Sequence, residues 1–230
     1  MSTNIELIKK LRKDTILESH ELKQLLTTLT KEDEEFLYSQ AREVKKEVYG
    51  DEVYIRGLIE FTNYCKKDCV YCGIRASNRN ADRYRLSFDE IMECTDLGYG
   101  RGLRTVVLQG GEDPFFTDDY MCEIIRAIKQ RHADCAITLS IGEKSHEAYV
   151  KFYEAGADRY LLRHETINSE HYSKIHSPSQ SIATRVECLK DLKSIGYQVG
   201  CGIMIGSPYQ TVDNIVEDLL FMKSFQPHMI

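Results

Sequence analysis

The stretch VYIRGLIEFTNYCKKDCVYCGI (residues 53–74) runs from a β-rich segment directly into a loop that carries three cysteines, Cys65, Cys69 and Cys72. Its first ten residues are rich in β-branched and aromatic side chains, which predicts a strand. Further β-rich runs lie at residues 104–109, 135–140, 158–165 and 197–206. Helical patterns alternate with them near residues 87–99, 118–131, 145–155, 181–195 and 211–224. This alternation is typical of parallel β/α units.

A doubly wound sheet and a closed barrel both fit the alternation. No Gly-x-Gly-x-x-Gly loop opens the first helix, which disfavours the dinucleotide-binding fold. We therefore expect an α/β protein with a (β/α)8 TIM-type barrel. Such a barrel takes about 250 residues, and a sixth strand begins at FQPHMI (residues 225–230). We expect a barrel truncated after about five β/α units.

The first 48 residues have apolar positions at helical spacing and no β-rich run. Thr30 precedes Lys31, Glu32 and Asp33, which is typical of a helix N-cap with acidic residues in the first turn. We expect an N-terminal helical extension over residues 1–50 and the barrel, without its C-terminal strands, over residues 51–230.

The composition is that of a soluble globular protein, with 42% hydrophobic and 29% charged residues. A net charge of -6 disfavours nucleic acid as a partner. No apolar run is long enough to span a membrane, and the charged first residues do not resemble a secretory signal. We therefore expect a cytoplasmic protein, in which the eight cysteines serve metal binding or catalysis rather than disulfides.

The spacing C-x3-C-x2-C places three thiols on one short loop. Four cysteines close a 4Fe–4S cube, as in electron carriers. Three leave one iron open to another ligand, which favours a cluster with a chemical role. A zinc site completed by a distant residue, or a chance grouping without metal, are the alternatives. We expect the other cysteines to be small buried hydrophobes, namely Cys94, Cys122, Cys135, Cys188 and Cys201.

In a β/α barrel the functional face lies at the carboxyl ends of the strands. The cysteine loop follows the first predicted strand there, and QGGEDP (residues 109–114) follows the second. Ser140 ends the third strand, residues 163–165 end the fourth, and residues 204–206 end the fifth. These features predict a single site at one end of the barrel.

Alternation along the fourth strand places Arg159, Arg163 and Glu165 on one face and Tyr160 and His164 on the other. The second face meets the helices, so we expect His164 to be packed rather than catalytic. Charged side chains in a barrel interior are costly unless they pair or meet a polar ligand. We expect a ligand cavity, with a mutual salt bridge as the alternative.

The sequence CKKDCVYC (residues 65–72) resembles the radical SAM signature C-x3-C-x-aromatic-C, with Tyr71 in the aromatic position. The resemblance implies a 4Fe–4S cluster on the three cysteines and S-adenosylmethionine on the open iron. It also implies one-electron cleavage of that cofactor to methionine and a 5'-deoxyadenosyl radical. Gly110, Gly111 and Glu112 resemble the Gly-Gly-Glu motif with which the family holds the cofactor's amino group.

Wider segments resemble the HydE family of iron-iron hydrogenase maturases, from about Tyr54 to the end of the chain. They include residues 58–75, 105–114, 138–143, 154–166 and 202–211. The resemblance implies further cofactor contacts from Thr138, Ser140, Arg163, Glu165, Arg185, Met204 and Ile205. We also expect substrate contacts from Arg56 and Arg159. Two departures from the family pattern are Gly110, where we expect serine, and residues 176–181, which are one residue longer than expected.

The resemblance implies a radical step on a small molecule or small iron complex during assembly of the hydrogenase diiron subcluster. It implies an electron donor, other hydrogenase maturation proteins as partners, and anaerobic conditions. A methylornithine synthase-like or biotin synthase-like enzyme is the alternative, although RHETIN (residues 163–168) differs from the NHNLDT expected in biotin synthase. An iron–sulfur carrier or scaffold is the non-enzyme alternative.

Overall fold

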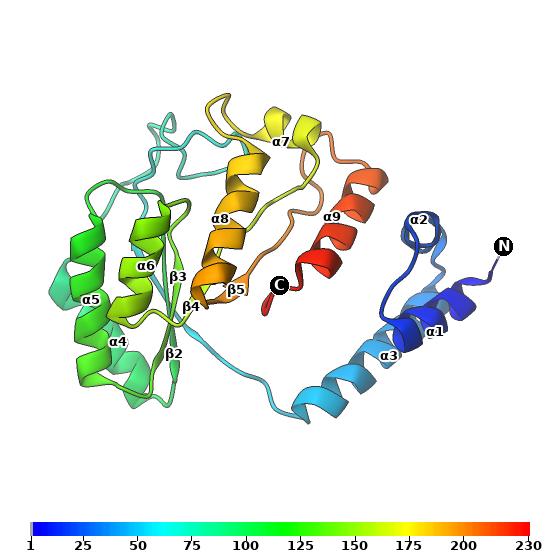
Figure 1. Ribbon diagram of the computed structural model, residues 1–230, viewed down its shortest axis with the longest axis horizontal. Helices are drawn as coiled ribbons and strands as arrows, with labels where there is room; N and C mark the ends of the chain where they lie inside the picture. The colour runs from blue at the N-terminus through cyan, green and yellow to red at the C-terminus, as the bar shows by residue number, and fades with distance from the viewer. Residues whose placement is uncertain (1) are drawn as a thin grey trace. The chain divides into compact units, whose positions relative to one another are not determined.

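The strands of the protein form one parallel sheet in the order β1-β2-β3-β4-β5 (Figure 1). Their bounds in the computed structural model, which describes residues 2–230, are β1 Gly57–Thr62, β2 Thr105–Gly110, β3 Ala136–Ser140, β4 Arg159–Leu161 and β5 Gln198–Gly200. A doubly wound sheet would reverse its strand order part-way. The sequential order confirms the predicted barrel-type architecture.

Five strands are present among residues 2–230, and the last of these residues begin a sixth strand next to β5. Met229 forms a parallel bridge to Gly200, and the Cys201 backbone N–H donates to the Met229 carbonyl at 3.1 Å. The sequence FQPHMI therefore begins a strand beside β5, as predicted.

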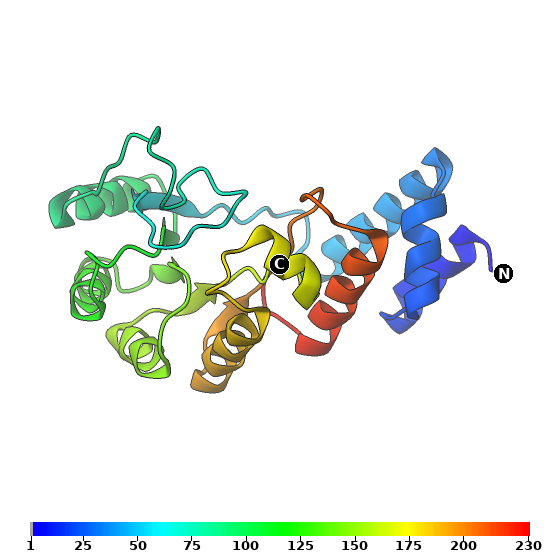
Figure 2. The same ribbon diagram turned by 90° about the horizontal axis from the view of Figure 1, so that it is seen from above.

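Helices cover one face of this sheet. They are α4 Phe88–Gly100, α5 Asp118–Arg131, α6 His146–Ala155 and α8 Ile182–Ile195, whereas the short helix α7 Ser169–Ile175 lies near the carboxyl ends of the strands (Figure 1). Viewed from above, α4, α5, α6 and α8 lie in an arc along one side of the strands (Figure 2). Side-chain caps start most of them: Ser87 and Glu90, for example, form a capping box at α4.

The apolar core lies between the sheet and these helices. Alternate strand residues such as Phe61, Leu108, Ile137, Tyr160 and Val199 are at most 2% exposed. Burying a side chain of this size stabilises the fold by about 1.5–3 kcal/mol. The other face carries polar side chains, for example Glu60 and Gln109, which hydrogen-bond at 3.0 Å. The sheet therefore presents a polar inner surface to the barrel interior.

Two of the predicted strands are longer than the observed ones. The fourth was expected over residues 158–165, but β4 ends at Leu161; beyond it the pairing continues only as an isolated parallel bridge between Glu165 and Ile203, where Glu165 has φ +64°. The fifth was expected over residues 197–206 and β5 ends at Gly200. Helix α7 was not predicted, since its seven residues are too few to show a periodic pattern.

A second compact unit contains the N-terminal segment up to Tyr54 together with Gln210–Phe225. Its helices are α1 Asn4–Asp14, α2 Ser19–Thr28, α3 Lys31–Tyr49 and α9 Val212–Phe225. Thr30 caps α3 as predicted. The predicted domain boundary after residue 50 stays a prediction, and α9, from the predicted barrel region, groups with these helices. Met1, which the predicted extension includes, lies outside the described residues.

A small apolar cluster holds the N-terminal helices together. Leu7, Ile8, Leu17 and Leu25 are its buried members, each at most 5% exposed. None of the helices in the described part of the chain is both long and apolar enough to span a bilayer.

Candidate active site

The cysteine loop lies between β1 and α4 and is fastened at both ends. The Arg83 guanidinium donates to the carbonyls of Asn63 before the loop and of Ile74, Arg75 and Asn78 after it. One side chain thus closes the segment that contains Cys65, Cys69 and Cys72. All three cysteines are partly exposed and are free thiols.

The three thiols line one open cavity of about 310 Å³ at the carboxyl ends of the strands. Residues that follow β1, β2, β3 and β4 all reach it. The predicted site residues among its lining are Tyr71, Gly110, Gly111, Glu112, Ser140, Arg163, Glu165 and Arg185. The structure therefore brings together, in one place, residues that are up to 120 positions apart in the sequence, as between Cys65 and Arg185.

The loop after β2 packs directly on the cysteine loop. The Glu112 backbone N–H donates to the Cys65 sulfur at 3.4 Å, and the Lys66 N–H donates to the Glu112 carbonyl at 3.0 Å. A Cβ on Gly111 would lie 2.2 Å from the Tyr64 carbonyl oxygen and 2.7 Å from Cys65 Cβ. Position 111 therefore requires glycine, because the two backbones approach too closely for any side chain.

A neighbouring carboxylate, Asp113, anchors that loop. Arg85 binds it with two hydrogen bonds of 2.6 and 2.9 Å, and the Thr62 hydroxyl donates at 2.8 Å. Although burial by itself raises the pKa of Asp113, these donors hold it below its ordinary value. Arg85 in turn lies 3.9 Å from the centre of the Tyr64 ring.

The Glu112 side chain is only 8% exposed and is incompletely bonded. Its Oε1 accepts a hydrogen bond of 3.3 Å from the Glu143 backbone, whereas Oε2 has no hydrogen-bond partner among residues 2–230. The ammonium groups of Lys66 and Lys67 stand 3.7 and 3.8 Å from Oε2. Burial raises the pKa of Glu112 above its ordinary value. Buried carboxylates are costly unless fully bonded, so Oε2 is an acceptor available to a ligand.

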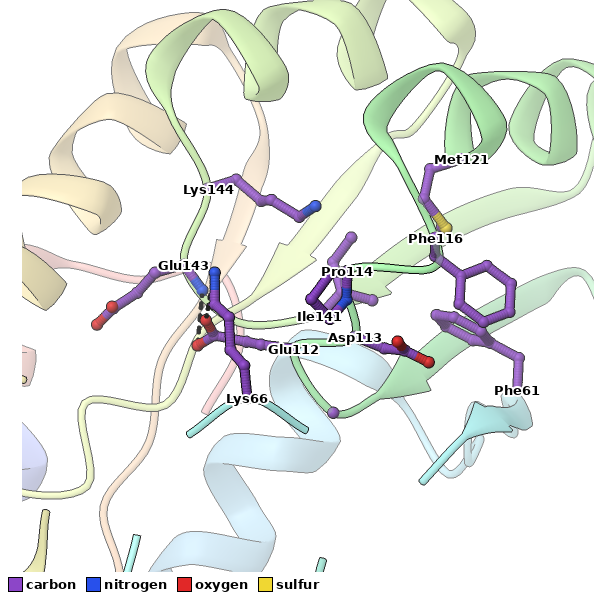
Figure 3. Close-up of a pocket in the computed structure, with 11 residues that line it drawn as sticks. Phe61, Lys66, Glu112, Asp113, Pro114, Phe116, Met121, Ile141, Glu143 and Lys144 are labelled. Carbon is purple, nitrogen blue, oxygen red and sulfur yellow. Dashed lines mark hydrogen bonds and ion pairs between the residues drawn. The ribbon is translucent and has the colours of Figure 1, made fainter. Parts of the chain in front are cut away.

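Glycine also makes room for this carboxylate. Gly142 has φ +79°, and a Cβ there would lie 2.2 Å from Glu112 Cγ. Figure 3 shows the Glu112 carboxylate beside Lys66 and the backbone of Glu143, in a small pocket next to the main cavity, with the Glu143 side chain pointing away from it.

Glu143 forms a second, fully paired charged group. It accepts a hydrogen bond of 2.7 Å from Arg185 Nε and one of 3.1 Å from Lys67 Nζ. Although burial raises the pKa of Glu143, Arg185 and Lys67 hold it below its ordinary value. Arg185 also donates to the Arg163 carbonyl at 2.9 Å. Lys67, inside the cysteine loop, is thereby joined to α8.

Glu165 enters the cavity on a strained backbone. Its φ of +64° is unusual for a residue with a side chain. The segment is held by hydrogen bonds from the Glu165 N–H to the Gly202 carbonyl and from the Met204 N–H to the Glu165 carbonyl, both 3.0 Å. Burial raises the pKa of the Glu165 carboxyl. Strain of this kind persists where surrounding structure enforces it, and it is common at functional sites.

Tyr71 is held by a buried histidine. Its hydroxyl lies 3.1 Å from His176 Nε2, and His176 Nδ1 lies 3.1 Å from the Tyr172 carbonyl. Burial lowers the pKa of His176 to about 4, so the ring is neutral near pH 7. Nδ1 must carry the ring proton, because it faces a carbonyl, and Nε2 therefore accepts from Tyr71.

Comparison with known proteins decides the family. Residues 59–222 match the radical SAM superfamily. The chain belongs to this superfamily. It is 45% identical over 209 residues to the FeFe hydrogenase maturase subunit HydE of Thermotoga maritima, which covers 91% of this chain and 59% of HydE. The predicted resemblance to the radical SAM superfamily and to HydE is thus confirmed.

Two further relatives agree with this assignment. The chain is 31% identical over 216 residues to 3-methylornithine synthase of Methanosarcina acetivorans, covering 93% of this chain and 61% of that protein. It superimposes on the crystal structure of methylornithine synthase (PylB) with a TM-score of 0.88 and 30% identity, covering 96% and 65% of the two chains. The chain spans about three fifths of the length of the curated relatives it matches.

Membership of the radical SAM superfamily implies a 4Fe–4S cluster and S-adenosylmethionine as cofactors. The residues present fit both. Among residues 2–230 no three His, Cys, Asp or Glu side chains converge as the ligands of one metal ion would. In a 4Fe–4S cluster each cysteine binds a different iron. The open Glu112 acceptor beside the thiols suits a cationic ligand group.

Not every predicted site residue of this radical SAM chain lies at the cavity. Arg159 starts β4 at its amino end and binds Gln198 and Thr105 at 2.7 and 3.1 Å. Arg56 is exposed just before β1, also at the amino end. The structure thus does not bring either arginine to the site, because strand alternation gives the face of a residue but not its height. Thr138, Met204 and Ile205 lie outside the lining residues too; Thr138 is one inward position below Ser140.

Several site residues escaped the sequence analysis. Lys67, Glu143 and Gln180 all line or adjoin the cavity and pair with predicted residues. Glu143 carried a usable signal, since it follows the third strand at the functional end. Cys94 is exposed, contrary to expectation, because it lies on the solvent side of α4, whereas Cys122, Cys135, Cys188 and Cys201 are buried.

Proposed function

We propose that the protein is a radical SAM enzyme that acts in assembly of the iron-iron hydrogenase active-site cluster, as a HydE-like maturase. One observation carries the proposal: three thiols of a C-x3-C-x2-C loop line the same cavity as a buried, incompletely bonded glutamate and a buried arginine. The 45% identity to HydE supports the choice of pathway.

In this proposal Cys65, Cys69 and Cys72 hold a 4Fe–4S cluster. Glu112 Oε2 and the backbone of Gly110 and Gly111 hold the ammonium group of S-adenosylmethionine. The cofactor carboxylate is matched by arginine, for which Arg163 and Arg185 are the candidates at the cavity. Other contacts inferred from the family are those of Tyr71, Thr138, Ser140, Glu165, Met204 and Ile205. When bound, the two cofactors supply one-electron chemistry that splits S-adenosylmethionine into methionine and a 5'-deoxyadenosyl radical.

The protein's own residues prepare the site for these groups. Two backbone N–H donors, from Lys67 and Glu112, face the Cys65 sulfur and orient it. Burial excludes water from the Glu112 carboxylate. An ammonium group that binds there therefore supplies a partner that the carboxylate lacks and does not have to displace bound water. The Arg185–Glu143–Lys67 group fixes the cysteine loop relative to α8.

The remaining parts of the proposal concern partners. We propose a small molecule or small iron complex as the substrate, a separate electron donor for the cluster, and other hydrogenase maturation proteins as partners. A cytoplasmic, anaerobic setting suits such a reaction. Arg56 and Arg159, at the amino ends of the strands, are not part of this substrate site.

The test is anaerobic reconstitution of the full-length protein with iron and sulfide, followed by reduction and assay of 5'-deoxyadenosine. We expect formation of 5'-deoxyadenosine in the wild type and none above background in Cys69→Ala. Cys94→Ala is the matched control, because Cys94 is exposed outside the site, and it should retain activity. A cluster that forms but never cleaves S-adenosylmethionine would instead favour an iron–sulfur carrier or scaffold.

A methylornithine synthase-like reaction is the second candidate, favoured by the TM-score of 0.88 to that enzyme. A biotin synthase-like reaction has weaker support, with 24% identity over 198 residues. All three share the first step. If the protein restores hydrogenase activity in a maturation assay that lacks HydE, the result would support the maturase. If it does not restore that activity but converts an amino acid substrate, the result would support the second candidate.

A further inference from the structure

The Cys69 sulfur has a buried side-chain neighbour from a distant part of the chain. The Gln180 amide lies against it, with Nε2 at 3.6 Å and Oε1 at 3.7 Å. Gln180 is only 8% exposed, and its backbone N–H donates to the Ser177 carbonyl at 2.9 Å. A buried, backbone-anchored amide in contact with a cysteine of the site calls for a physical account.

Ser177 determines which amide atom faces the sulfur. Its hydroxyl donates to Gln180 Oε1 at 2.9 Å, and it lies 3.1 Å from the Ser179 hydroxyl, which completes the chain of hydrogen bonds. With Oε1 satisfied, Nε2 is left to donate. A cysteine that ligates iron is a thiolate without a proton, so its sulfur only accepts. The hydrogen bond therefore runs from Gln180 Nε2 to Cys69 Sγ.

Hydrogen bonds to cluster sulfurs change the reduction potential. Reduction adds negative charge to the cluster and its ligands, and a donor stabilises that charge, so the potential rises. At Cys65 the two donors are the backbone N–H groups of Lys67 and Glu112, which no side-chain substitution removes. At Cys69 the donor is the Gln180 side chain, and the Tyr71 side chain is a second neighbour of the same sulfur. Gln180 is thus a point at which a single substitution alters the electrostatics of the cluster.

We propose that Gln180 is a positioning residue for Cys69, which donates a hydrogen bond to the ligand sulfur and raises the reduction potential of the bound cluster. The inference rests on the proposed function, since it requires a cluster on Cys69. A cluster with a higher reduction potential accepts an electron more readily from the electron donor before S-adenosylmethionine is cleaved.

The test is a redox titration of the reconstituted full-length protein, with dithionite as the source of electrons and the electron paramagnetic resonance signal of the reduced cluster as the readout. We expect Gln180→Leu, which removes the donor, to shift the midpoint potential to more negative values. Gln180→Glu has nearly the same shape but replaces the donor by a negative charge, so a larger shift in the same direction is expected. Gln198→Leu, a matched change at the amino end of β5, should leave the potential unchanged.

Two outcomes would overturn the inference. The first is an unchanged potential in both Gln180 variants at wild-type cluster occupancy, which would leave Gln180 a purely packing residue. If those variants fail to assemble a cluster, Ser177→Ala serves as the test, because it frees the Gln180 amide to rotate while leaving Gln180 in place. The second outcome would be a midpoint potential that does not become more negative in Ser177→Ala. A wild-type protein that binds no cluster would fail the proposed function itself, and the inference with it.

Discussion

Charged side chains at the two ends of the same sheet differ in their burial and in their partners. At the amino end, Arg159 lies between Gln198 and Thr105, neutral partners that satisfy it near solvent. At the carboxyl end, Glu112 is buried with one oxygen unbonded, and Arg185 is buried on Glu143. Both ends face the barrel interior, yet only one combines burial, paired charge and an open acceptor.

This difference teaches how a binding site is recognised. An inward-facing charge that is hydrated or satisfied by neutral groups has no need of a ligand. A buried charge without a complete set of partners carries a desolvation cost that a ligand of opposite charge relieves. Substitutions at the two ends should therefore have unequal and distinct effects.

The largest effect on stability is expected from Arg185→Met. It leaves Glu143 buried with Lys67 as its remaining cation, and loss of one partner of a buried pair costs about 3–5 kcal/mol. Urea unfolding of the protein without cofactors measures this cost. The double variant Arg185→Met/Glu143→Leu should recover much of the loss; a double variant no more stable than the single one would show that the pair is not the cause.

A separate effect, on binding and not on stability, is expected from Glu112→Gln. Removing the negative charge that meets the cofactor ammonium should weaken S-adenosylmethionine binding by about 10- to 100-fold, the equivalent of about 1.5–3 kcal/mol. The free energy of unfolding should stay the same or rise, because the uncharged amide is cheaper to bury. Isothermal titration of the reconstituted protein and urea unfolding test the two halves. A stability loss with unchanged affinity would reverse the assignment.

The two buried glutamates should respond to pH with opposite sign. The pKa of Glu143 is lowered by folding, so its contribution is present above the unfolded pKa of about 4.3 and is lost as the pH falls through the folded value. The pKa of Glu112 is raised, so protonation of Glu112 as the pH falls favours the folded state. Unfolding free energies measured from pH 7 to pH 3 should therefore fall less steeply in Glu143→Gln than in the wild type. In Glu112→Gln they should fall more steeply, and parallel curves would contradict both assignments.

The smallest effect is expected from Arg159→Met at the amino end. Its hydrogen bonds are to neutral, accessible groups, so the free energy of unfolding should change by no more than about 1 kcal/mol. Affinity for S-adenosylmethionine should equal that of the wild type. A tenfold loss of affinity would show that the amino end takes part in the site and would remove the contrast between the two ends.

Most of the fold was predictable from the sequence. Strands β1, β2 and β3 and helices α4, α5, α6, α8 and α9 lie within a few residues of their predicted ranges. Their signals are local: alternation, helical periodicity and capping residues such as Ser87. The predicted fourth strand was too long, because the turn at Glu165 depends on contacts with Gly202 and Met204 that local pattern does not contain.

The sequence by itself determined where the chemistry of the site lies: the spacing of Cys65, Cys69 and Cys72 puts three thiols on one loop and favours a cluster with one open iron, and strand order places that loop with Glu112 at one end of a barrel. Only the tertiary structure decided that Lys67, Glu143 and Gln180 are partners in that site, and that Arg159 is not. The physical reason is that spacing and periodicity act within a segment, whereas hydrogen bonds and burial depend on which segments meet. Gln180 and Cys69, 111 residues apart, become neighbours only when the barrel folds.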